Sequence, residues 1–356
     1  MPNRQQEMYD LLEEVLKKDA TDLHLVVGRR PVLRINGSLC PIEDRPVLSE
    51  DDVKELSFSL LSPDQQEKFQ VQKDIDFACN YLNKARFRAN VYRQMGFLSS
   101  EFRFIPSKIR TIEELSLPSI LSQFTRATQG FFLVVGPSGH GKSTALAAMI
   151  DEINHTRFDH IMTIEDPVEY LFQPDKCIID QREVGIDVLD FHRGLRSMFR
   201  QDADVVMIGE MRDPETISTA ITAAETGHLI FSTLHTNTAA QTVDRIIDIF
   251  PPHQQSQIRS QLAVTLLGVL SRRLIPCEQG GMINAIELLI ANTAVRNLIR
   301  EGKAHQIDMV IDTSLEEGMI SLNRSLADLV LRGLVSFENA ELYSPSPAEL
   351  RLLLGQ

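Results

Sequence analysis

The chain has 356 residues, of which 43% are hydrophobic and 24% charged, and its formal net charge is −13. This length predicts two domains, because a single hydrophobic core does not keep growing in a chain of this size. The acidic net charge is unfavourable for a broad nucleic-acid-binding surface, although it is compatible with a local basic channel. No apolar run approaches the roughly 18 residues of a membrane span, and the four cysteines (Cys40, Cys79, Cys177 and Cys277) include no C-x-x-C pair, so we expect no integral membrane segment, no zinc site and a reducing cytosol.

The first hundred residues mix helices with short strands. Gln5 to Lys18 places its apolar residues on one helical face, and the apolar runs LHLVV and VLRIN that follow are separated by a turn. Ser49 and Asp52 have the spacing of a capping box at the start of a second helix. We therefore expect a small α+β domain over residues 1–105, followed by a linker over residues 106–118.

Two longer runs of this region, ARFRANVYRQ and FLSSEFRFI, predict a hairpin around Met95-Gly96. With a two-residue turn there, Arg88 stands directly opposite Arg103, and facing like charges destabilise a sheet unless an anion or an acid neutralises them. One interpretation is a solvated surface cluster neutralised by Glu101. The other is contact with phosphate in a neighbouring subunit, where an arginine finger can raise the rate by about 10³–10⁵. We place Arg88 and Arg103 among the catalytic residues and Arg86 among the nucleotide-binding residues.

A strand, a glycine-rich loop and a helix follow one another from Gly130 to Ala148. The buried run FFLVV precedes a G-x-x-x-x-G-K-S loop, and good helix formers follow it, which is the order that a phosphate-binding P-loop requires. The glycines let backbone N–H groups converge on an anion, Lys142 reaches the β- and γ-phosphates, and Ser143 offers a hydroxyl to Mg²⁺. The sequence therefore predicts a site for ATP and Mg²⁺. Its nucleotide-binding residues are Gly136, Pro137, Ser138, Gly139, His140, Gly141, Lys142, Ser143 and Thr144.

Strands and helices alternate after this loop. The runs HIMTIE, CIID, VVMIG, LIFSTL and AIELLIA predict strands, with helices between them. This pattern is typical of an α/β domain with a largely parallel sheet, which we place at residues 119–292. Residues 293–356 are expected to be mostly helical.

Two of these strands end in carboxylates, where ligands bind in open α/β sheets. Glu165 and Asp166 follow HIMTIE, and Glu210 follows VVMIG, with Gly209 at the place where many P-loop proteins have an aspartate. We assign Glu210 to the magnesium and water network and Glu165 to polarising the attacking water. Helix capping is the alternative for Asp166 and for Asp213, and for Asp213 we favour it. The residues expected to hold Mg²⁺, directly or through water, are Ser143, Glu165, Asp166 and Glu210.

Two histidines flank the strand LIFSTL. His228 and His235 are about 23 Å apart along an extended strand, so they cannot share a metal. His235 follows a strand that should end near the γ-phosphate, and we expect it to sense that phosphate by hydrogen bonding. We place His235 among the catalytic residues and His228 among the nucleotide-binding residues.

Together these segments resemble the secretion and type IV pilus ATPase superfamily, most closely its pilus-retraction (twitching-motility) branch. The motifs that carry the resemblance are GPSGHGKSTALAAMID, TIEDPVEY, VVMIGEMRDPETI and TGHLIFSTLHTNTA, together with RFRANVYRQ and TAVRNLIREGK. They occur in the family's order and cover nearly the whole chain.

The resemblance implies a PAS-like first domain, a RecA-like P-loop NTPase domain and a helical C-terminal region. It also implies a homohexamer that binds nucleotide between subunits, hydrolyses ATP and works in the cytoplasm at the inner face of the cytoplasmic membrane, on the platform protein of a pilus machine.

Some residues depart from the retraction pattern. His140 replaces a small polar residue, and QREVG (residues 181–185) with the segment 311–333 is similar to a paralogous, auxiliary branch of the retraction ATPases. An auxiliary nucleotide-binding subunit that acts with another retraction motor therefore stays open beside the autonomous motor. The missing C-x-x-C pair disfavours an assembly or secretion ATPase, and the acidic balance disfavours a nucleic-acid motor.

Overall fold

The computed structural model describes residues 4–35, 37–82, 84–105 and 108–355. The described residues form two compact units, one within Met1–Lys108 together with Pro167–Leu171, the other within Ile109–Asp166 together with Phe172–Gln356. Each unit has its own hydrophobic core.

The first unit is an α+β domain built on one antiparallel sheet. Six strands pair in the order β3-β2-β1-β6-β5-β4. Their bounds are Asp22–Val26 (β1), Val32–Ile35 (β2), Ser38–Pro41 (β3), Asp74–Tyr81 (β4), Ala85–Gln94 (β5) and Phe97–Ile105 (β6). The helices are α1 (Arg4–Lys17), α2 (Glu50–Phe58) and α3 (Pro63–Gln72). The predicted capping box of α2 is confirmed, because Ser49 and Asp52 exchange both hydrogen bonds.

The predicted hairpin of β5 and β6 is confirmed, including its register. Met95 and Gly96 form the turn with φ of 47° and 88°, and Arg88 pairs with Arg103 across the two strands. Such positive φ values are those of a tight hairpin turn that keeps the strands in register. Phe87 and Ala89 on the opposite face of β5 are fully buried. The two arginines therefore share the less buried face of this sheet.

The compact units differ from the predicted domain boundaries in two places. Residues 109–118 belong to the second unit, and residues 167–171 belong to the first, because Arg86 Nε donates to the carbonyl of Val168 and Arg88 lies 3.6 Å from Glu169. Residues 106 and 107 of the predicted linker lie outside the described residues. Thr111 and Glu114 have the spacing of a capping box and exchange both of its hydrogen bonds, but they close a turn rather than begin a helix.

The second unit contains a seven-stranded sheet in the order β13-β12-β7-β11-β10-β8-β9. All neighbours pair in parallel except β12 with β13. The bounds are Gly130–Val135 (β7), His160–Glu165 (β8), Ile178–Glu183 (β9), Val205–Ile208 (β10), Leu229–Leu234 (β11), Leu266–Pro276 (β12) and Met282–Ile290 (β13). The predicted, largely parallel sheet is confirmed.

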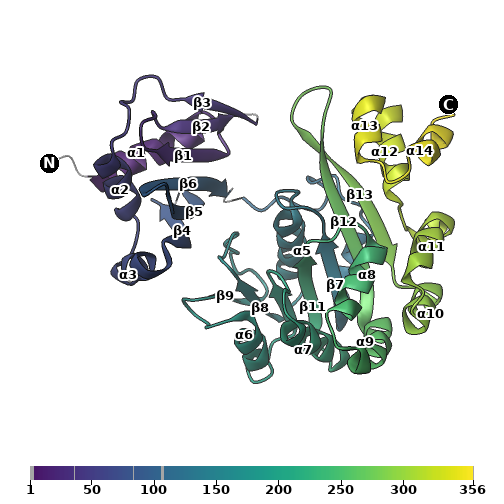
Figure 1. Cartoon of the computed structure of the whole chain (residues 1–356). Helices are drawn as coiled ribbons and strands as arrows, with labels where there is room; N and C mark the ends of the chain where they lie inside the picture. Colours follow the sequence, from purple (N-terminus) through teal and green to yellow (C-terminus); the bar gives the residue numbers. More distant parts are fainter. Residues whose placement is uncertain (1–3, 36, 83, 106–107, 356) are drawn as a thin grey trace. The chain divides into compact units, whose positions relative to one another are not determined.

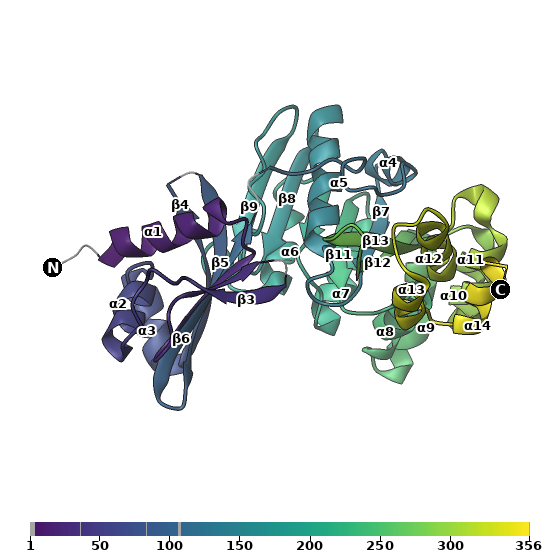
Figure 2. The same ribbon diagram turned by 90° about the horizontal axis from the view of Figure 1, so that it is seen from above.

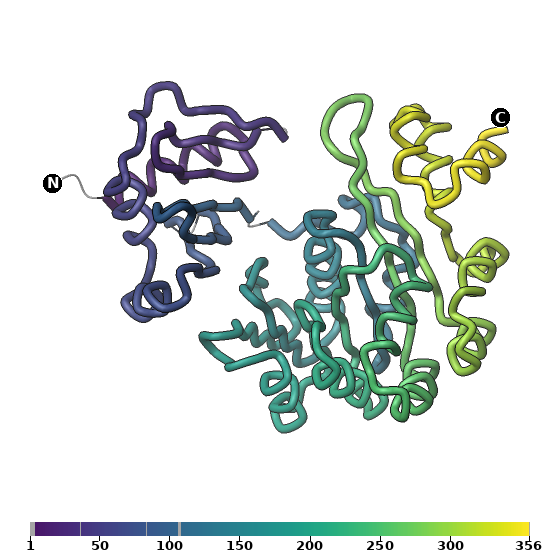
Figure 3. The backbone as a smooth tube through the Cα atoms, in the orientation of Figure 1, coloured from purple at the N-terminus to yellow at the C-terminus, as the bar shows by residue number. Residues whose placement is uncertain are grey.

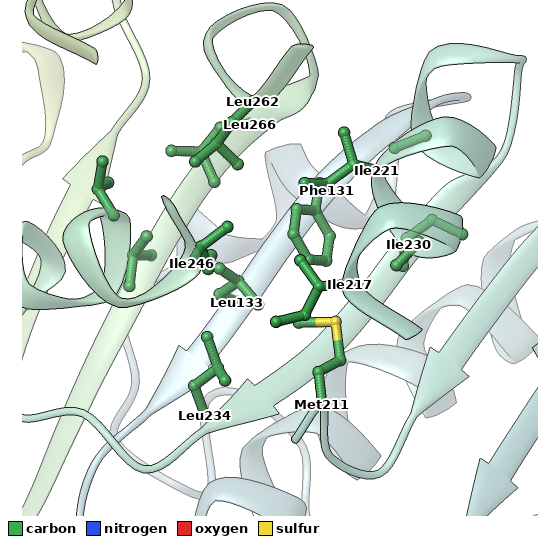
Figure 4. Close-up of a cluster of buried hydrophobic side chains, with 14 of the residues drawn as sticks. Phe131, Leu133, Met211, Ile217, Ile221, Ile230, Leu234, Ile246, Leu262 and Leu266 are labelled. Carbon is green, nitrogen blue, oxygen red and sulfur yellow. The ribbon is translucent and has the colours of Figure 1, made fainter. Parts of the chain in front are cut away.

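Helices cover both faces of this sheet (Figures 1 and 2). The helices α4 (Leu121–Thr125) and α5 (Lys142–Thr156) lie on one face, and α7 (Pro214–Glu225), α8 (Ala239–Asp248) and α9 (Pro252–Thr265) on the other, while α6 (Phe191–Met198) packs beside α7 and β8. Every residue of β7 is buried, and Figure 4 shows Phe131 and Leu133 together with Ile217 of α7, Ile246 of α8 and Leu262 of α9. The central strand is apolar throughout because it is covered on both sides.

The β12–β13 hairpin was only half predicted. β13 contains the expected AIELLI run, but β12, with Arg272 and Arg273 in its middle, was not predicted as a strand, and β13 pairs with it in antiparallel fashion. The hairpin extends beyond the other strands of the sheet, as the tube in Figure 3 shows. β12 nevertheless pairs with β7, the strand that leads into the P-loop.

The chain from Thr293 on is helical, as expected. Its helices are α10 (Thr293–Glu301), α11 (Ile307–Thr313), α12 (Leu322–Leu331), α13 (Phe337–Tyr343) and α14 (Pro347–Leu353), with short 3₁₀ turns η1 (Ala304–Gln306) and η2 (Leu315–Glu317). The helices α12 to α14 pack as a separate cluster against β12 and β13. Among the described residues, no helix combines the length and the apolar composition that a membrane crossing needs.

Candidate nucleotide-binding and catalytic site

The P-loop joins the buried strand β7 to the helix α5 in the second unit. The strand ends at Val135, and the helix begins at Lys142 after Gly141, which has a φ of 76° as its N-cap. Ser143 is thus in the first turn of a helix of 15 residues. The N–H groups and the partial positive charge of such a helix start form an anion site, so the loop has the geometry that a phosphate requires.

The strand β12 supports this loop from behind. A side chain at Gly136 would overlap the carbonyl oxygen of Arg272, so only glycine fits there. The residue Arg272 is 2% exposed. Its guanidinium donates to the carbonyl of Gly141 and to the side chain of Asn284 on β13. Two glycines of the P-loop are therefore held against one buried arginine.

The unusual His140 makes a specific contact with the same strand. Its Nδ1 accepts the backbone N–H of Leu274 at 2.9 Å, so the neutral ring carries its proton on Nε2. Burial lowers the pKa of His140, and the cations of Arg273, Lys142 and Arg272 lower it further. The ring therefore stays neutral at neutral pH and keeps accepting this hydrogen bond.

Lys142 is buried at the start of α5. It is 8% exposed, and its Nζ donates to the carbonyls of Gly136 and Pro137, each at 3.0 Å. The same Nζ lies 3.5 Å from Nδ1 of His235, which follows the neighbouring strand β11. The lysine thus joins the P-loop to the predicted phosphate-sensing histidine.

His235 also lies beside Glu210, the glutamate that follows the VVMIG strand. Its Nε2 is 3.6 Å from a carboxylate oxygen of Glu210, which forms an ion pair with Arg212. Burial and the charge of Lys142 lower the pKa of His235. The carboxylate of Glu210 raises it, but the net pKa is lowered. Lys142 begins α5 after the P-loop, while His235 and Glu210 follow the adjacent strands β11 and β10, and the three side chains form one continuous cluster.

Glu165 ends the next strand of the sheet, β8. It is 6% exposed and accepts a hydrogen bond of 2.6 Å from the hydroxyl of Thr163. The strands β8 and β10 pair in parallel, and the backbone N–H of Gly209 donates to the carbonyl of Ile164, so Glu165 at the end of β8 and Glu210 just after β10 lie at the same end of the sheet. Both carboxylates therefore lie at the edge of the sheet where β7 opens into the P-loop.

The two remaining candidates near this edge behave differently. Asp213 accepts the backbone N–H of Thr216 at 2.7 Å as the N-cap of α7, which confirms the predicted capping role. Asp166 follows Glu165 directly and is exposed, but no helix begins there. Helix capping does not account for Asp166.

The structure does not bring His228 to the P-loop. His228 precedes β11, and its carbonyl accepts the N–H of Gly130 at the beginning of β7, whereas the P-loop follows the end of β7. A ring nitrogen of His228 contacts the carbonyl of Ala223 at 3.0 Å, and its ring packs against Phe199. Within one chain His228 thus lies at the opposite end of the strands from the P-loop, because it precedes β11, whereas ligands bind outside the carboxyl ends of parallel strands.

Arg103 is paired with acids of its own unit. Its guanidinium lies 2.7 Å from Asp22, which is 2% exposed, and 3.2 Å from Glu101. Burial raises the pKa of Asp22, but the hydrogen bonds from Thr21 and Arg103 outweigh this effect and the net pKa is lowered. Glu101 thus contacts Arg103, as the surface-cluster interpretation required, together with an acid that the sequence pattern did not reveal.

The ion pairs of Arg88 are longer than those of Arg103. Its guanidinium lies 3.6 Å from Glu169 and 3.9 Å from Asp76, and its side chain is 40% exposed. Arg86, on the same face of β5, donates to Asn80 as well as to the carbonyl of Val168. These three arginines belong to the first unit.

A cavity of about 180 Å³ lies beside the P-loop within the second unit. Its lining includes Gly141 and Thr144 of the loop and helix, Arg110 and Glu114 of the preceding segment, and Leu274 of β12. Sequence reasoning missed Arg110, Arg272 and Asn284 as parts of this site. The available signal was the pair Arg272-Arg273 inside an otherwise apolar run, which marks polar contacts on a buried strand.

Residues 73–330 match the family model described as Type II/IV secretion system protein, which is most of the chain. The chain belongs to this family. It is 43% identical over 331 residues to the type IV pilus retractation ATPase PilT of Pseudomonas aeruginosa, covering 93% of this chain and 96% of that protein. It is 36% identical over 349 residues to the type IV pilus ATPase PilU of the same organism, covering 98% and 91%. A crystal structure of the pilus retraction motor PilT with bound ADP matches with a TM-score of 0.88 and 43% identity, covering 97% of this chain and 98% of that one.

These similarities confirm the resemblance inferred from the motifs and the predicted fold class of a secretion-family ATPase. The donor set fits magnesium, since Ser143 lies in the first turn of α5, Glu165 is the last residue of β8, and Glu210 comes shortly after the neighbouring strand β10. Within the described ranges there is no cluster of three or more histidine, cysteine, aspartate or glutamate side chains suited to a metal.

Proposed function

We propose that this chain is an ATP-hydrolysing motor that powers type IV pilus retraction, and so twitching motility, as a homohexamer. It is an ATPase of the type II/IV secretion system family, and it binds nucleotide at its P-loop. The observation that carries the proposal is the continuous cluster of Lys142, His235 and Glu210 at the end of the P-loop strand. An adenine nucleotide placed on this loop puts its phosphates beside all three side chains.

The residues of this cluster have distinct roles in hydrolysis. Lys142 moves from the loop carbonyls to the β- and γ-phosphates, and Ser143 with Glu210 would hold Mg²⁺, directly or through water. An ion held there would neutralise charge on the phosphates. Glu165 polarises the attacking water, and its burial with the hydrogen bond from Thr163 fixes the carboxylate for this task. His235 detects the γ-phosphate through Lys142, whose Nζ lies 3.5 Å from the imidazole Nδ1.

The arginines of β5 and β6 act in trans in the ring. Arg88 and Arg103 stabilise charge on the phosphates of a neighbouring subunit, and Arg86 supports the same contact. Support comes from their shared face and from the weakness of the pairs that Arg88 makes, at 3.6 and 3.9 Å. The motor is expected at the cytoplasmic face of the inner membrane, on the platform protein of the pilus machine.

An auxiliary subunit of the PilU type is the second candidate. The PilU relative covers 98% of this chain, although at the lower identity of 36%. Such a subunit binds nucleotide and assembles with a related motor but contributes little hydrolysis itself. Robust steady-state ATPase activity of the purified chain alone eliminates this candidate.

The test is phosphate release by the purified chain with Mg²⁺ and ATP, followed by malachite green, with the oligomer mass measured in parallel. Lys142→Ala and Glu210→Ala should each abolish turnover, while Arg332→Ala, in an exposed ion pair with Asp328, should leave it unchanged. Wild-type turnover in either active-site variant would overturn the site assignment. Restored twitching in a piliated bacterium that lacks its retraction ATPase tests the pilus role separately.

A further inference from the structure

The link between β11 and α8 is anchored to a pair of side chains on the neighbouring hairpin. Ser271 of β12 and Glu287 of β13 face each other across the two strands. The Ser271 hydroxyl donates to the carbonyl of Asn237 at 2.8 Å, and Glu287 accepts the backbone N–H of Ala239 at 2.7 Å. The link that begins with His235 is thus held by hydrogen bonds at Asn237 and at Ala239.

A glutamate at position 287 is unfavourable for the stability of the fold. It is 6% exposed within the apolar run AIELLI of β13, and burying a carboxylate without a full set of partners is unfavourable. The acceptor position at the first residue of α8 offsets part of that cost, because the start of a helix favours negative charge. An apolar residue would fill the space without burying a polar group, so core packing alone does not require a hydrogen-bond acceptor at this position.

The charged groups around Glu287 come from two further elements. Asp308 and Asp312 of α11 repel its charge, and Arg273 of β12 attracts it. Burial is the largest cause of the shift that raises the pKa of Glu287 to about 7. The carboxylate therefore lies between the C-terminal helices and the start of α8.

We propose that Glu287 is a positioning residue for ATP hydrolysis, which holds the start of α8 and thereby fixes His235 against Lys142 and Glu210. The same hairpin holds the P-loop, since Arg272 follows Ser271 directly and donates to the carbonyl of Gly141. The β12–β13 hairpin thus sets the relative positions of the P-loop and of the His235 link. The inference rests on the proposed ATPase function.

The experiment compares Glu287→Leu with Glu287→Gln in the full-length protein. Leucine removes the acceptor for Ala239, and turnover per nucleotide-binding site should fall about tenfold or more, while the Kd of fluorescent ADP changes less than about threefold. Glutamine keeps an acceptor oxygen and should restore turnover to within about twofold of the wild type. Counting sites by ADP binding corrects for any protein that fails to fold.

Asn292→Ala is the matched control for stability. Asn292 follows the same strand and caps α10 through the N–H of Val295, so its loss weakens the fold without touching the His235 link. Turnover per site should stay at the wild-type value in this variant.

The outcomes separate two failures. Wild-type protein that releases no phosphate contradicts the proposed ATPase function. Active wild-type protein with unchanged turnover in Glu287→Leu contradicts the positioning role alone. An equal loss in Glu287→Leu and Asn292→Ala also contradicts it, because general destabilisation would then explain both.

Discussion

The Nδ1 atom of His235 lies 3.5 Å from Nζ of Lys142, and its Nε2 lies 3.6 Å from Glu210. The imidazole of His235 thus lies between the P-loop lysine and the carboxylate of Glu210. Burial and Lys142 keep the pKa of His235 below its ordinary value, so the ring is neutral at neutral pH. A neutral ring has one nitrogen to accept and one N–H to donate, which suits a group that passes the state of the phosphate from Lys142 to Glu210.

His235→Ala should lower turnover more than nucleotide affinity. Hydrogen bonds to charged groups contribute about 1.5–3 kcal/mol, which corresponds to a fall in kcat of roughly 10- to 150-fold. The Kd of ADP should change less than about threefold, since the P-loop remains held by Arg272. Phosphate release and fluorescent-ADP binding measure the two effects. Equal losses in both would assign His235 to ground-state binding instead.

Gly136→Ala and Gly139→Ala should differ sharply. A Cβ at Gly136 overlaps the carbonyl oxygen of Arg272, whereas at Gly139 it meets no atom within 4 Å. Both have positive φ, so Gly139→Ala carries backbone strain of about 1–2 kcal/mol, and Gly136→Ala adds a clash with backbone. We expect Gly136→Ala to abolish ADP binding and Gly139→Ala to weaken it about tenfold, measured by titration of fluorescent ADP. Similar affinities in the two variants would contradict the close contact with β12.

Local patterns predicted the parts of the site that depend on neighbouring residues in the chain. The P-loop, the turn at Met95-Gly96 and the cap at Asp213 each follow from a few adjacent residues, and each was found where expected. The partners across the sheet were not predictable in this way. Arg272 and Glu287 gain their roles only when β12 lies between β7 and β13, and that order is not written in any local run.

His228 lies away from the P-loop, and the sequence already carried that signal. It precedes β11, and the rule that ligands bind outside the carboxyl ends of strands, which placed His235 near the phosphate, places His228 at the opposite end. The acidic partner of Arg103, in contrast, had no local signal, because Asp22 comes from β1, about eighty residues earlier in the chain. Pairing between distant strands is set by the whole fold, so a single sequence carries little direct signal for it.

His140→Ala should weaken nucleotide binding moderately. It removes the acceptor for the Leu274 N–H, and one neutral hydrogen bond contributes about 0.5–1.5 kcal/mol, or roughly two- to tenfold in Kd. His140→Asn is the control, because its side-chain oxygen can replace Nδ1 as acceptor, and its Kd should stay within about twofold. Binding of fluorescent ADP measures both. Tighter binding in His140→Ala would mean that the histidine hinders the nucleotide rather than supporting the loop.

The stability of the protein should carry a pH dependence from Glu287. Burial, with smaller effects of Asp308 and Asp312, raises its pKa from 4.5 to about 7, so the folded protein binds the proton more tightly than the unfolded chain does. Stabilisation from this group is fully present below the unfolded pKa of 4.5 and is lost as the pH rises through about 7. Glu287→Gln removes that dependence. Between about pH 5 and pH 8 its Tm should therefore fall less than that of the wild type, and parallel Tm curves would contradict the raised pKa.

Arg88 and Arg103 should affect catalysis in the ring rather than nucleotide affinity. Arg88→Ala breaks only long pairs to Glu169 and Asp76, so it tests the trans contact directly. Arg103→Ala leaves the buried carboxylate of Asp22 without its strongest cation, which destabilises the first unit on its own account. The informative comparison for Arg103 is therefore Asp22→Asn alone against Asp22→Asn combined with Arg103→Ala.

In both comparisons we expect kcat to fall by at least about tenfold, with the Kd of ADP and the mass of the assembled ring unchanged. The reason is that a neighbour's arginine reaches the phosphates only in the assembled ring and stabilises charge that develops during hydrolysis. Phosphate release, ADP titration and native mass measurement cover the three quantities. Unchanged turnover in an intact ring would return both arginines to a surface cluster neutralised by Asp22, Glu101 and Glu169, whereas lost assembly would make them interface residues instead.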